Sequence, residues 1–186
     1  MKKLRIRSEY VIFILRMFVI FSVLVFVVTT FIFRTVRING QSMEPTLQSG
    51  EYAFSNRLAA DEGNINRFDV IVIDNIEEDY VVKRVIALPN ETISYKDGKL
   101  YINGEWYEEP FLDQEYIALH TMNNQITFTQ NFGPITLGEN EYFVLGDNRL
   151  NSKDSRVVGP IPEKDIVAKD VIVVYPLNSI RVESSN

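Results

Sequence analysis

The feature that most constrains this chain is an apolar stretch of 24 residues, 10–33, in which Arg16 is the only charged residue. As a helix rising 1.5 Å per residue, the stretch would be roughly 36 Å long, enough to span a hydrocarbon core of about 30 Å. Arg16 lies near its start, where a long side chain can extend back to the lipid headgroups. No junction of small residues follows the stretch, so we interpret it as an uncleaved membrane anchor.

Charge is unevenly divided along the chain. Residues 1–37 hold seven basic residues and one acid, whereas the other 149 residues hold 12 basic and 24 acidic side chains. The positive-inside rule therefore predicts a cytoplasmic N-terminus (1–9), a transmembrane anchor (10–33) and an extracytoplasmic domain (34–186). We therefore expect a single-pass protein of the plasma membrane, with the lipid bilayer as a partner. The acidic domain would repel phosphate backbones, so we expect no nucleic-acid partner.

The composition also excludes several kinds of site. The chain has no cysteine, which removes disulfides, thiol nucleophiles and thiolate metal ligands. The single histidine, His120, argues against a histidine-rich metal centre, and no acidic segment has the ligand spacing of a calcium loop. We therefore expect neither a metal nor a cofactor.

Beyond the anchor, short β-patterned segments alternate with turn signals, which predicts an all-β domain. A small inserted β subdomain is expected at 105–140, where the patterning weakens. Asp97-Gly98 predicts a tight hairpin turn, and 162–166 predicts a short helix. The predicted strands are 34–38, 51–56, 69–74, 80–88, 91–96, 99–104, 126–130, 141–146 and 170–176.

Three polar islands interrupt this pattern. The first, at 40–47, reads GQSMEPTL; the second, at 83–89, reads KRVIALP; the third, at 146–156, reads GDNRLNSKDSR. Taken singly, each has an ordinary explanation as a turn, a strand with an exposed cation or a polar loop. Taken together, they supply the parts of a nucleophilic site.

A serine hydroxyl is a weak nucleophile and needs an adjacent base, and one histidine in a weakly patterned segment makes a Ser-His-Asp triad hard to build. A lysine can serve instead if it is neutral, which requires burial among apolar groups. Valines flank Lys83 on one face of its predicted strand, and Val82 and Ile86 flank Arg84 on the other. The alternation therefore leaves open which of the two cations is buried.

In this order behind an N-terminal anchor, SMEPTL, KRVIALP and GDNRLNSKDSR resemble signature boxes of the type I signal peptidase family, and RFDVIVI at 67–73 resembles a further box. The resemblance implies a mainly antiparallel β catalytic domain of the signal peptidase and repressor-protease type. It also implies a membrane-bound serine endopeptidase that needs no cofactor. Its partners would be the signal peptides of exported preproteins, which it would cleave after small residues, commonly Ala-x-Ala.

The resemblance also implies roles for individual residues. Ser42 would be the nucleophile, Lys83 its general base and Ser152 the residue that orients the lysine amine. Gly40 lacks the hydroxyl that one branch of the family carries at this position, so the oxyanion hole would use the backbone N–H of Ser42, as in the Gram-positive branch. Apolar substrate pockets would be lined by Met43, Val81 and Val82. A polar frame beneath the site would consist of Asp147, Arg149, Asp154 and Arg156.

Two observations bear on the alternatives. Ser42 follows the anchor by nine residues, at most about 30 Å of extended chain, so it must lie near the membrane surface, where a signal peptide's cleavage site emerges. A non-catalytic or specialised homologue that serves surface or pilus assembly remains an alternative, although the serine and lysine are both present. A self-cleaving regulator of the repressor kind would need a DNA-binding domain where residues 1–37 form an anchor.

Overall fold

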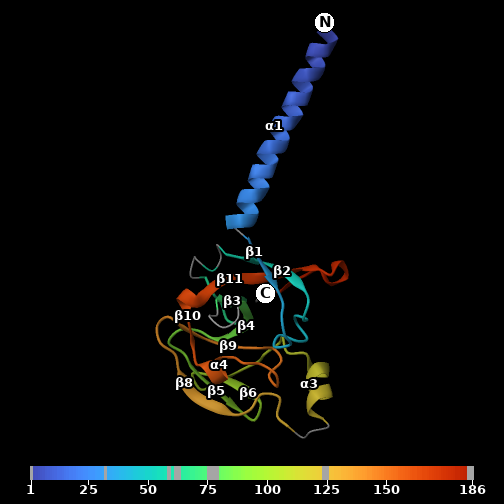
Figure 1. Cartoon of the computed structure of the whole chain (residues 1–186). Helices are drawn as coiled ribbons and strands as arrows, with labels where there is room; N and C mark the ends of the chain where they lie inside the picture. The colour runs from blue at the N-terminus through green and yellow to red at the C-terminus, as the bar shows by residue number, and fades with distance from the viewer. Residues whose placement is uncertain are drawn as a thin grey trace.

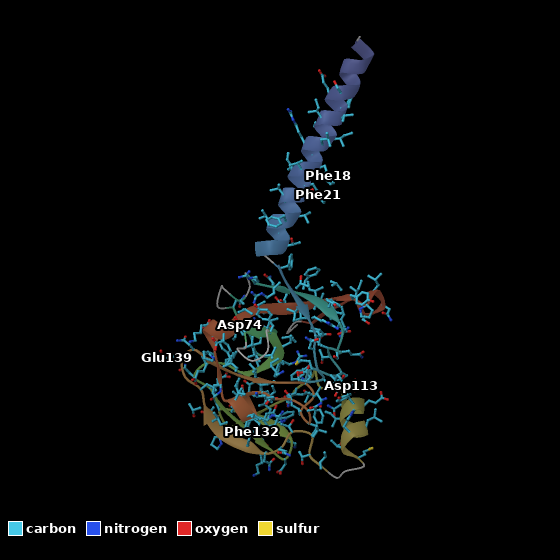
Figure 2. The ribbon with its side chains drawn as sticks, viewed as in Figure 1. Phe18, Phe21, Asp74, Asp113, Phe132 and Glu139 are labelled. Carbon is cyan, nitrogen blue, oxygen red and sulfur yellow. The ribbon has the colours of Figure 1, made fainter. Side chains whose placement is uncertain are left out.

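The computed structural model of the chain describes residues 2–31, 33–57, 60, 64–74, 80–122 and 126–183. A long helix, α1 (Lys2–Phe31), extends away from a β-rich domain (Figure 1). Phe18 and Phe21 project from this helix with no other described segment beside them (Figure 2). The segment Ser8–Thr29 is long and apolar enough to cross a membrane. A helix that is apolar on all sides and exposed is suited to lipid.

The junction between helix and domain differs slightly from the prediction. Phe33, expected inside the anchor, instead begins strand β1 (Phe33–Arg37), where it pairs with Asn56 and its ring contacts Phe54 edge-on at 6.2 Å. The ring has an aromatic partner in the domain, and an apolar pattern alone cannot distinguish that partner from lipid. The predicted orientation rests largely on basic residues before the anchor. The structure does not describe the side chains of four of them, Lys2, Lys3, Arg5 and Arg7.

Eight strands form the larger sheet, in the order β1-β2-β11-β3-β4-β9-β10 with β12 paired to β11, and every neighbouring pair is antiparallel. β11 bends at Asp170, which has a φ of 55°. Its first half pairs with β3 and its second half with β12 along the same edge. The other strands of this sheet are β2 (Tyr52–Asn56), β3 (Val70–Asp74), β4 (Tyr80–Ala87), β9 (Glu141–Leu145), β10 (Ile161–Pro162), β11 (Ile166–Tyr175) and β12 (Arg181–Glu183).

A second sheet, of order β7-β6-β5-β8, lies at the end of the domain farthest from α1 (Figure 1). The predicted turn at Asp97-Gly98 is confirmed: both residues have positive φ, and Lys96 pairs with Lys99 across it. Because type I′ turns need two positive φ angles, Asp-Gly suits this connection. The strands are β5 (Thr92–Lys96), β6 (Lys99–Ile102), β7 (Glu105–Tyr107) and β8 (Phe132–Thr136).

The prediction of a strand at 126–130 is wrong. The strand of this region is β8, which pairs with β5. Thr129 is instead buried as a hydrogen-bond partner of Arg149, and Phe128 contacts the ring of Tyr116. β8 escaped prediction because it contains Gly133 and Pro134, residues that weaken a strand pattern but are tolerated on an edge strand. The other predicted strands match observed ones, with ends within two residues for all but β11, which begins at Ile166.

Helical elements are few and short in the β domain. The predicted insertion 105–140 contains a helix, α3 (Gln114–Thr121), whereas only β structure was expected there. Asp113 caps it by accepting hydrogen bonds from the backbone N–H groups of Glu115 and Tyr116. The helix predicted at 162–166 is a single 3₁₀ turn, η1 (Glu163–Asp165). Other helical elements in the described ranges include α4 (Ser155–Val158) and a second 3₁₀ turn, η2 (Leu177–Ser179).

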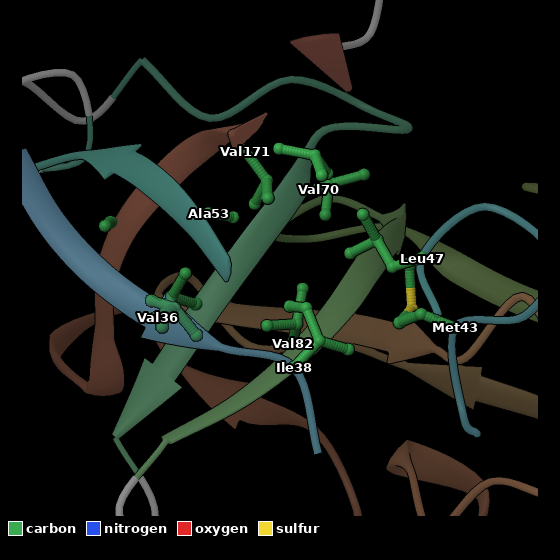
Figure 3. Packing of buried hydrophobic residues seen from close by; sticks show 11 residues of the cluster. Val36, Ile38, Met43, Leu47, Ala53, Val70, Val82 and Val171 are labelled. Carbon is green, nitrogen blue, oxygen red and sulfur yellow. The ribbon is translucent and has the colours of Figure 1, made fainter. Parts of the chain in front are cut away.

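The core of the larger sheet is an apolar cluster to which β1, β2, β3, β4 and β11 all contribute (Figure 3). Met43 and Leu47, from the loop after β1, close one end of it and are almost wholly buried. A second cluster joins the two sheets, and in it Phe143 of β9 packs with Ile93 and Leu100. The loop that carries the first polar island is therefore held by the core itself.

Truncating Phe143 tests the packing between the two sheets. Its side chain is fully buried and stacks on Phe132 with ring centroids 5.4 Å apart. We expect Phe143→Ala to lower the free energy of unfolding by about 3–5 kcal/mol because it leaves a cavity. Denaturant titration of the full-length protein in detergent measures this. Leu119→Ala, at an exposed position on α3, should change stability by less than about 0.5 kcal/mol. A loss below about 1 kcal/mol for Phe143→Ala would contradict this packing.

Candidate active site

Ser42 lies in the loop 39–50, hereafter the Ser42 loop. Leu47 N–H donates to the Met43 carbonyl at 2.9 Å and Glu44 N–H donates to the Gln41 carbonyl at 3.2 Å, so the loop forms a tight turn. The side chains of Met43 and Leu47 anchor this turn in the core. Ser42 is half-buried on the turn, at the mouth of two cavities.

Lys83 lies in β4, opposite Ile71 of β3, and its Nζ is 2.8 Å from Ser42 Oγ. Nζ also donates a hydrogen bond to the Val82 carbonyl at 3.1 Å. The lysine is only 6% exposed. The sequence left open whether Lys83 or Arg84 is buried, and both are, because the two faces of β4 are covered by different parts of the domain.

Arg84, on the opposite face of β4, holds Asp147 in a two-pronged ion pair. Its Nε donates to Oδ1 at 2.9 Å and its Nη2 donates to Oδ2 at 2.7 Å, and both side chains are almost fully buried. Thr46 of the Ser42 loop donates its hydroxyl to the same carboxylate at 2.6 Å. Asp147 therefore links β4, the Ser42 loop and the third island.

The third island also holds the Ser42 loop through its backbone. Asn148 N–H donates to the carbonyl of Ser42 at 3.0 Å, and the Asn148 side-chain amide donates to the carbonyl of Gln41 at 3.1 Å. A third contact joins Asn151 Nδ2 to Gln41 Oε1 at 3.2 Å. The two Asn148 contacts fix the peptide units on both sides of the Ser42 Cα.

Gly146 is where these segments approach most closely. A methyl group on its Cα would lie 2.4 Å from Ser152 Oγ and closer still to the Ser42 carbonyl oxygen, so only glycine fits. Ser152 Oγ is buried and forms no hydrogen bond of ordinary geometry with a described residue. It nevertheless lies near enough to Asp154 to help lower the pKa of that carboxyl. The expected contact between Ser152 and Lys83 thus remains a prediction.

Asp154 and Arg156 form a second two-pronged ion pair, with Nε–Oδ1 and Nη2–Oδ2 distances of 2.8 Å each. Asp154 Oδ2 also accepts a hydrogen bond from Gly146 N–H at 3.1 Å. Burial alone would raise the pKa of Asp154, but its hydrogen bonds and the charge of Arg156 hold that pKa below its usual value. The carboxylate therefore stays ionised and closes the loop back onto Gly146.

Arg149 connects the third island to the second sheet. Its side chain is fully buried and donates to Gly146 O at 3.0 Å, to Tyr95 Oη at 2.8 Å and to Glu109 Oε1 at 2.6 Å. Tyr95 donates its hydroxyl to the same glutamate oxygen at 2.6 Å. Burial raises the pKa of Tyr95 well above its usual value, so the phenol remains a donor.

The four frame residues expected from the sequence thus cluster beneath the Ser42–Lys83 contact, but only Asp154 and Arg156 pair with each other. The sequence analysis did not identify the partners of Asp147 and Arg149, which are Arg84 and Glu109 respectively. Arg84 could have been found, because it adjoins Lys83 in the second island. Glu109 carried no signal, because it belongs to a weakly patterned segment with several other acids.

Two cavities meet at Ser42 and Lys83. One, hereafter the β1 groove, has a volume of about 400 Å³ and is lined by residues 35–40, 42–43 and 80–83. The expected pocket residues Met43, Val81 and Val82 all lie in this lining. The other, hereafter the β10 cleft, has a volume of about 980 Å³ and continues from Ser42 along Ile73, Val144 and residues 160–162. Within the described ranges, no three His, Asp or Glu side chains gather as a metal site.

The chain is similar to known peptidases over most of its length. Residues 11–175 match the family described as signal peptidase, peptidase S26. The chain is 39% identical over 161 residues to signal peptidase I P of Bacillus subtilis subsp. natto, covering 86% of each chain. It is 38% identical over 165 residues to signal peptidase I T of Bacillus subtilis strain 168, covering 88% of this chain and 84% of that one. A crystal structure of a signal peptidase I from Enterococcus faecalis V583 is 35% identical, with a TM-score of 0.48, over 56% of this chain and 95% of that one.

The pH dependence of an Asp154 substitution tests whether the ionised carboxylate of Asp154 stabilises the fold. The folded pKa of Asp154 lies below the value of about 3.9 expected in the unfolded chain, so its ionised form stabilises the fold above about pH 4. This contribution is lost as pH falls through the folded pKa. We expect Asp154→Asn to cost about 2–3 kcal/mol at pH 7, with the difference from wild type shrinking below pH 4.

Denaturant titrations of the full-length protein at several pH values between 3 and 7 measure this difference. Asp113→Asn is the matched control, because asparagine also caps a helix and the site is exposed, so stability should change little. A penalty for Asp154→Asn that stays constant from pH 7 to pH 3 would contradict an ionised, stabilising Asp154.

Proposed function

The chain belongs to the peptidase S26 family of signal peptidases, which are serine endopeptidases, and from this premise we propose a mechanism and a substrate class. It cleaves the signal peptides of exported preproteins after small residues. Ser42 is the nucleophile and Lys83 is the general base. The observation that carries the proposal is the 2.8 Å separation between Lys83 Nζ and Ser42 Oγ in a site almost closed to water on the lysine side.

Burial favours the neutral form of Lys83, which can act as a base. Desolvation disfavours an ammonium, and Lys83 is buried beside apolar neighbours on this face of the sheet, Ile71, Val81 and Val85. A neutral amine has two N–H bonds and one lone pair. One N–H donates to the Val82 carbonyl, which leaves the lone pair to accept the Ser42 proton.

The reaction then follows from these positions. Ser42 Oγ attacks the scissile carbonyl carbon as its proton passes to Lys83 Nζ, giving a tetrahedral intermediate. The ammonium returns the proton to the leaving nitrogen as the C–N bond breaks, which frees the mature chain and leaves an acyl group on Ser42. Water then attacks this ester as Lys83 takes one of its protons. Lys83 passes that proton to Ser42 Oγ as the ester C–O bond breaks, and the signal peptide leaves as a carboxylic acid that ionises in water.

The negative oxygen of the intermediate needs a donor. The backbone N–H of Ser42 donates to no residue in the described ranges and is available for this purpose. Asn148 holds the carbonyls on either side of this nitrogen, so the donor is fixed before substrate arrives. Gly40 supplies no hydroxyl, so this N–H is the donor that we assign.

The β1 groove suits small side chains before the cut. Met43 and Val82 are nearly buried where they line the groove, so they form its apolar floor and offer no side-chain hydrogen bond. The groove also borders β1, which begins two residues after α1 ends. A signal peptide whose apolar segment is still in the bilayer reaches Ser42 along this groove. With the N-terminus cytoplasmic, the domain acts on the outer face of the membrane.

Cleavage of a preprotein by the full-length enzyme in detergent tests this function, with mass spectrometry locating the cut. We expect cleavage after a small-x-small sequence, and we expect Ser42→Ala and Lys83→Ala each to lower kcat by at least about a thousandfold. Lys96→Ala, an exposed lysine of β5, is the matched control and should retain wild-type turnover. Cleavage that survives either dyad substitution would overturn the assignment. Failure of the wild-type protein to cleave would favour a non-catalytic assembly role.

Ser152→Ala tests the positioning of the lysine. If the hydroxyl orients the Lys83 amine, we expect kcat to fall about tenfold or more with little change in KM. The free energy of unfolding should change by less than about 1 kcal/mol, since Ser152 Oγ forms no ordinary hydrogen bond whose loss would cost stability. The kcat of the variant should also show an altered pH profile. Wild-type kcat and an unchanged profile would remove Ser152 from the site.

A further inference from the structure

The β10 cleft is the larger of the two cavities that open at Ser42, and the dyad mechanism uses only its entrance. None of the residues that line it comes from β1, the strand that adjoins the membrane helix. The β1 groove, by contrast, is lined by residues 35–37 of that strand. A substrate that reaches Ser42 along the β1 groove must therefore continue into the β10 cleft on the other side of the scissile bond.

The lining of the β10 cleft is partly apolar and partly acidic. Its floor is formed by Ile73 and Val144, which are almost fully buried, and Val158 and residues 160–162 add further lining. The lining also includes two carboxylates: Asp74, the last residue of β3, which is labelled in Figure 2, and Asp165, the last residue of η1. Neither carboxylate has a hydrogen bond or ion pair with a described residue.

The net charge of the cleft follows from its remaining ionisable residues. Asp154 also lines the cleft but is neutralised by Arg156. Lys153 also lines the cleft and adds at most one positive charge, and Lys83 is neutral in the proposed mechanism. The cleft therefore carries net negative charge, and the domain around it is strongly acidic as well.

We propose that the β10 cleft binds the first residues of the mature chain, after the cut, and that Asp74 and Asp165 make it select against acidic residues there and favour basic ones. This inference rests on the proposed function, because it takes the direction of the substrate from it. The apolar floor gives general contact with an extended chain, and the two carboxylates give the charge preference. Substrate choice is thus set on both sides of the scissile bond, by size before it and by charge after it.

Two preproteins that differ only in the second residue after the cut, Lys or Glu, test the proposal with the full-length enzyme in detergent. One exposed charge pair typically changes a binding equilibrium by a few-fold. Here two carboxylates act on substrates whose charges differ by two, because Lys replaces Glu. We expect kcat/KM to be roughly fivefold higher for the Lys substrate at low salt. The ratio should fall towards one as salt is raised, because exposed charges are screened.

The double variant Asp74→Asn with Asp165→Asn should bring the ratio to about one, because the two carboxylates that set the charge preference are then gone. Glu115→Gln removes one negative charge on α3, outside the β10 cleft, and should leave the ratio at its wild-type value. A ratio of one in the wild-type enzyme, or a ratio that persists in the double variant, would overturn the proposal.

A binding experiment separates this inference from the proposed reaction. Peptides with the sequence of the mature N-terminus, carrying Lys or Glu, are titrated against the full-length Ser42→Ala protein by fluorescence anisotropy. We expect tighter binding of the Lys peptide, lost when Asp74→Asn and Asp165→Asn are added. Equal binding of the two peptides would refute the charge preference even if cleavage proceeds. Absence of cleavage with this preference intact would count against the reaction and not against the cleft.

Discussion

Two cations on opposite faces of one strand organise this domain. Lys83 points from β4 towards Ser42, and Arg84, the next residue, points the other way and holds Asp147. Asp147 belongs to the loop that also holds the Ser42 carbonyl through Asn148, and it accepts the hydroxyl of Thr46 from the Ser42 loop itself. β4 thus sets the position of the proposed base directly and the position of the proposed nucleophile through the Arg84–Asp147 pair.

The buried ion pairs fix the positions of the site residues more than they stabilise the fold. Taking two charges out of water costs about as much as their attraction returns, so a buried pair adds little net stability, whereas breaking one leaves an uncompensated charge. Here the pairs of Arg84, Arg149 and Arg156 all converge on the loop 146–156. The loop packs so closely around Gly146 that a methyl group on the Gly146 Cα would collide with Ser42 and Ser152. This close packing holds the Ser42 hydroxyl within hydrogen-bond distance of Lys83 Nζ.

Much of this arrangement could be predicted from the sequence, and the remainder has identifiable physical reasons. Segments rich in β-branched apolar residues, such as β3 and β4, and the Asp97-Gly98 turn were predictable because local sequence decides them. β8 was not, because Gly133 and Pro134 hide an edge strand, and the pattern of 126–130 serves packing beneath Arg149 instead of a ladder. The islands predicted which residues would gather, but not that Arg149 would pair with Glu109, since that partner lies 40 residues away in a segment without a distinctive pattern.

The central claim is that Lys83 is a neutral amine when it meets Ser42, and the ionisation of this one side chain tests it most directly. The full-length protein in detergent, labelled with ¹³C and ¹⁵N at lysine, allows the Cε and Nζ resonances to be followed from pH 5 to pH 11, with Lys83→Arg assigning the signal. The account predicts that Lys83 loses its proton well below the value of about 10.4 shown by ordinary exposed lysines. A Lys83 signal that remains that of an ammonium up to pH 10 would contradict the mechanism.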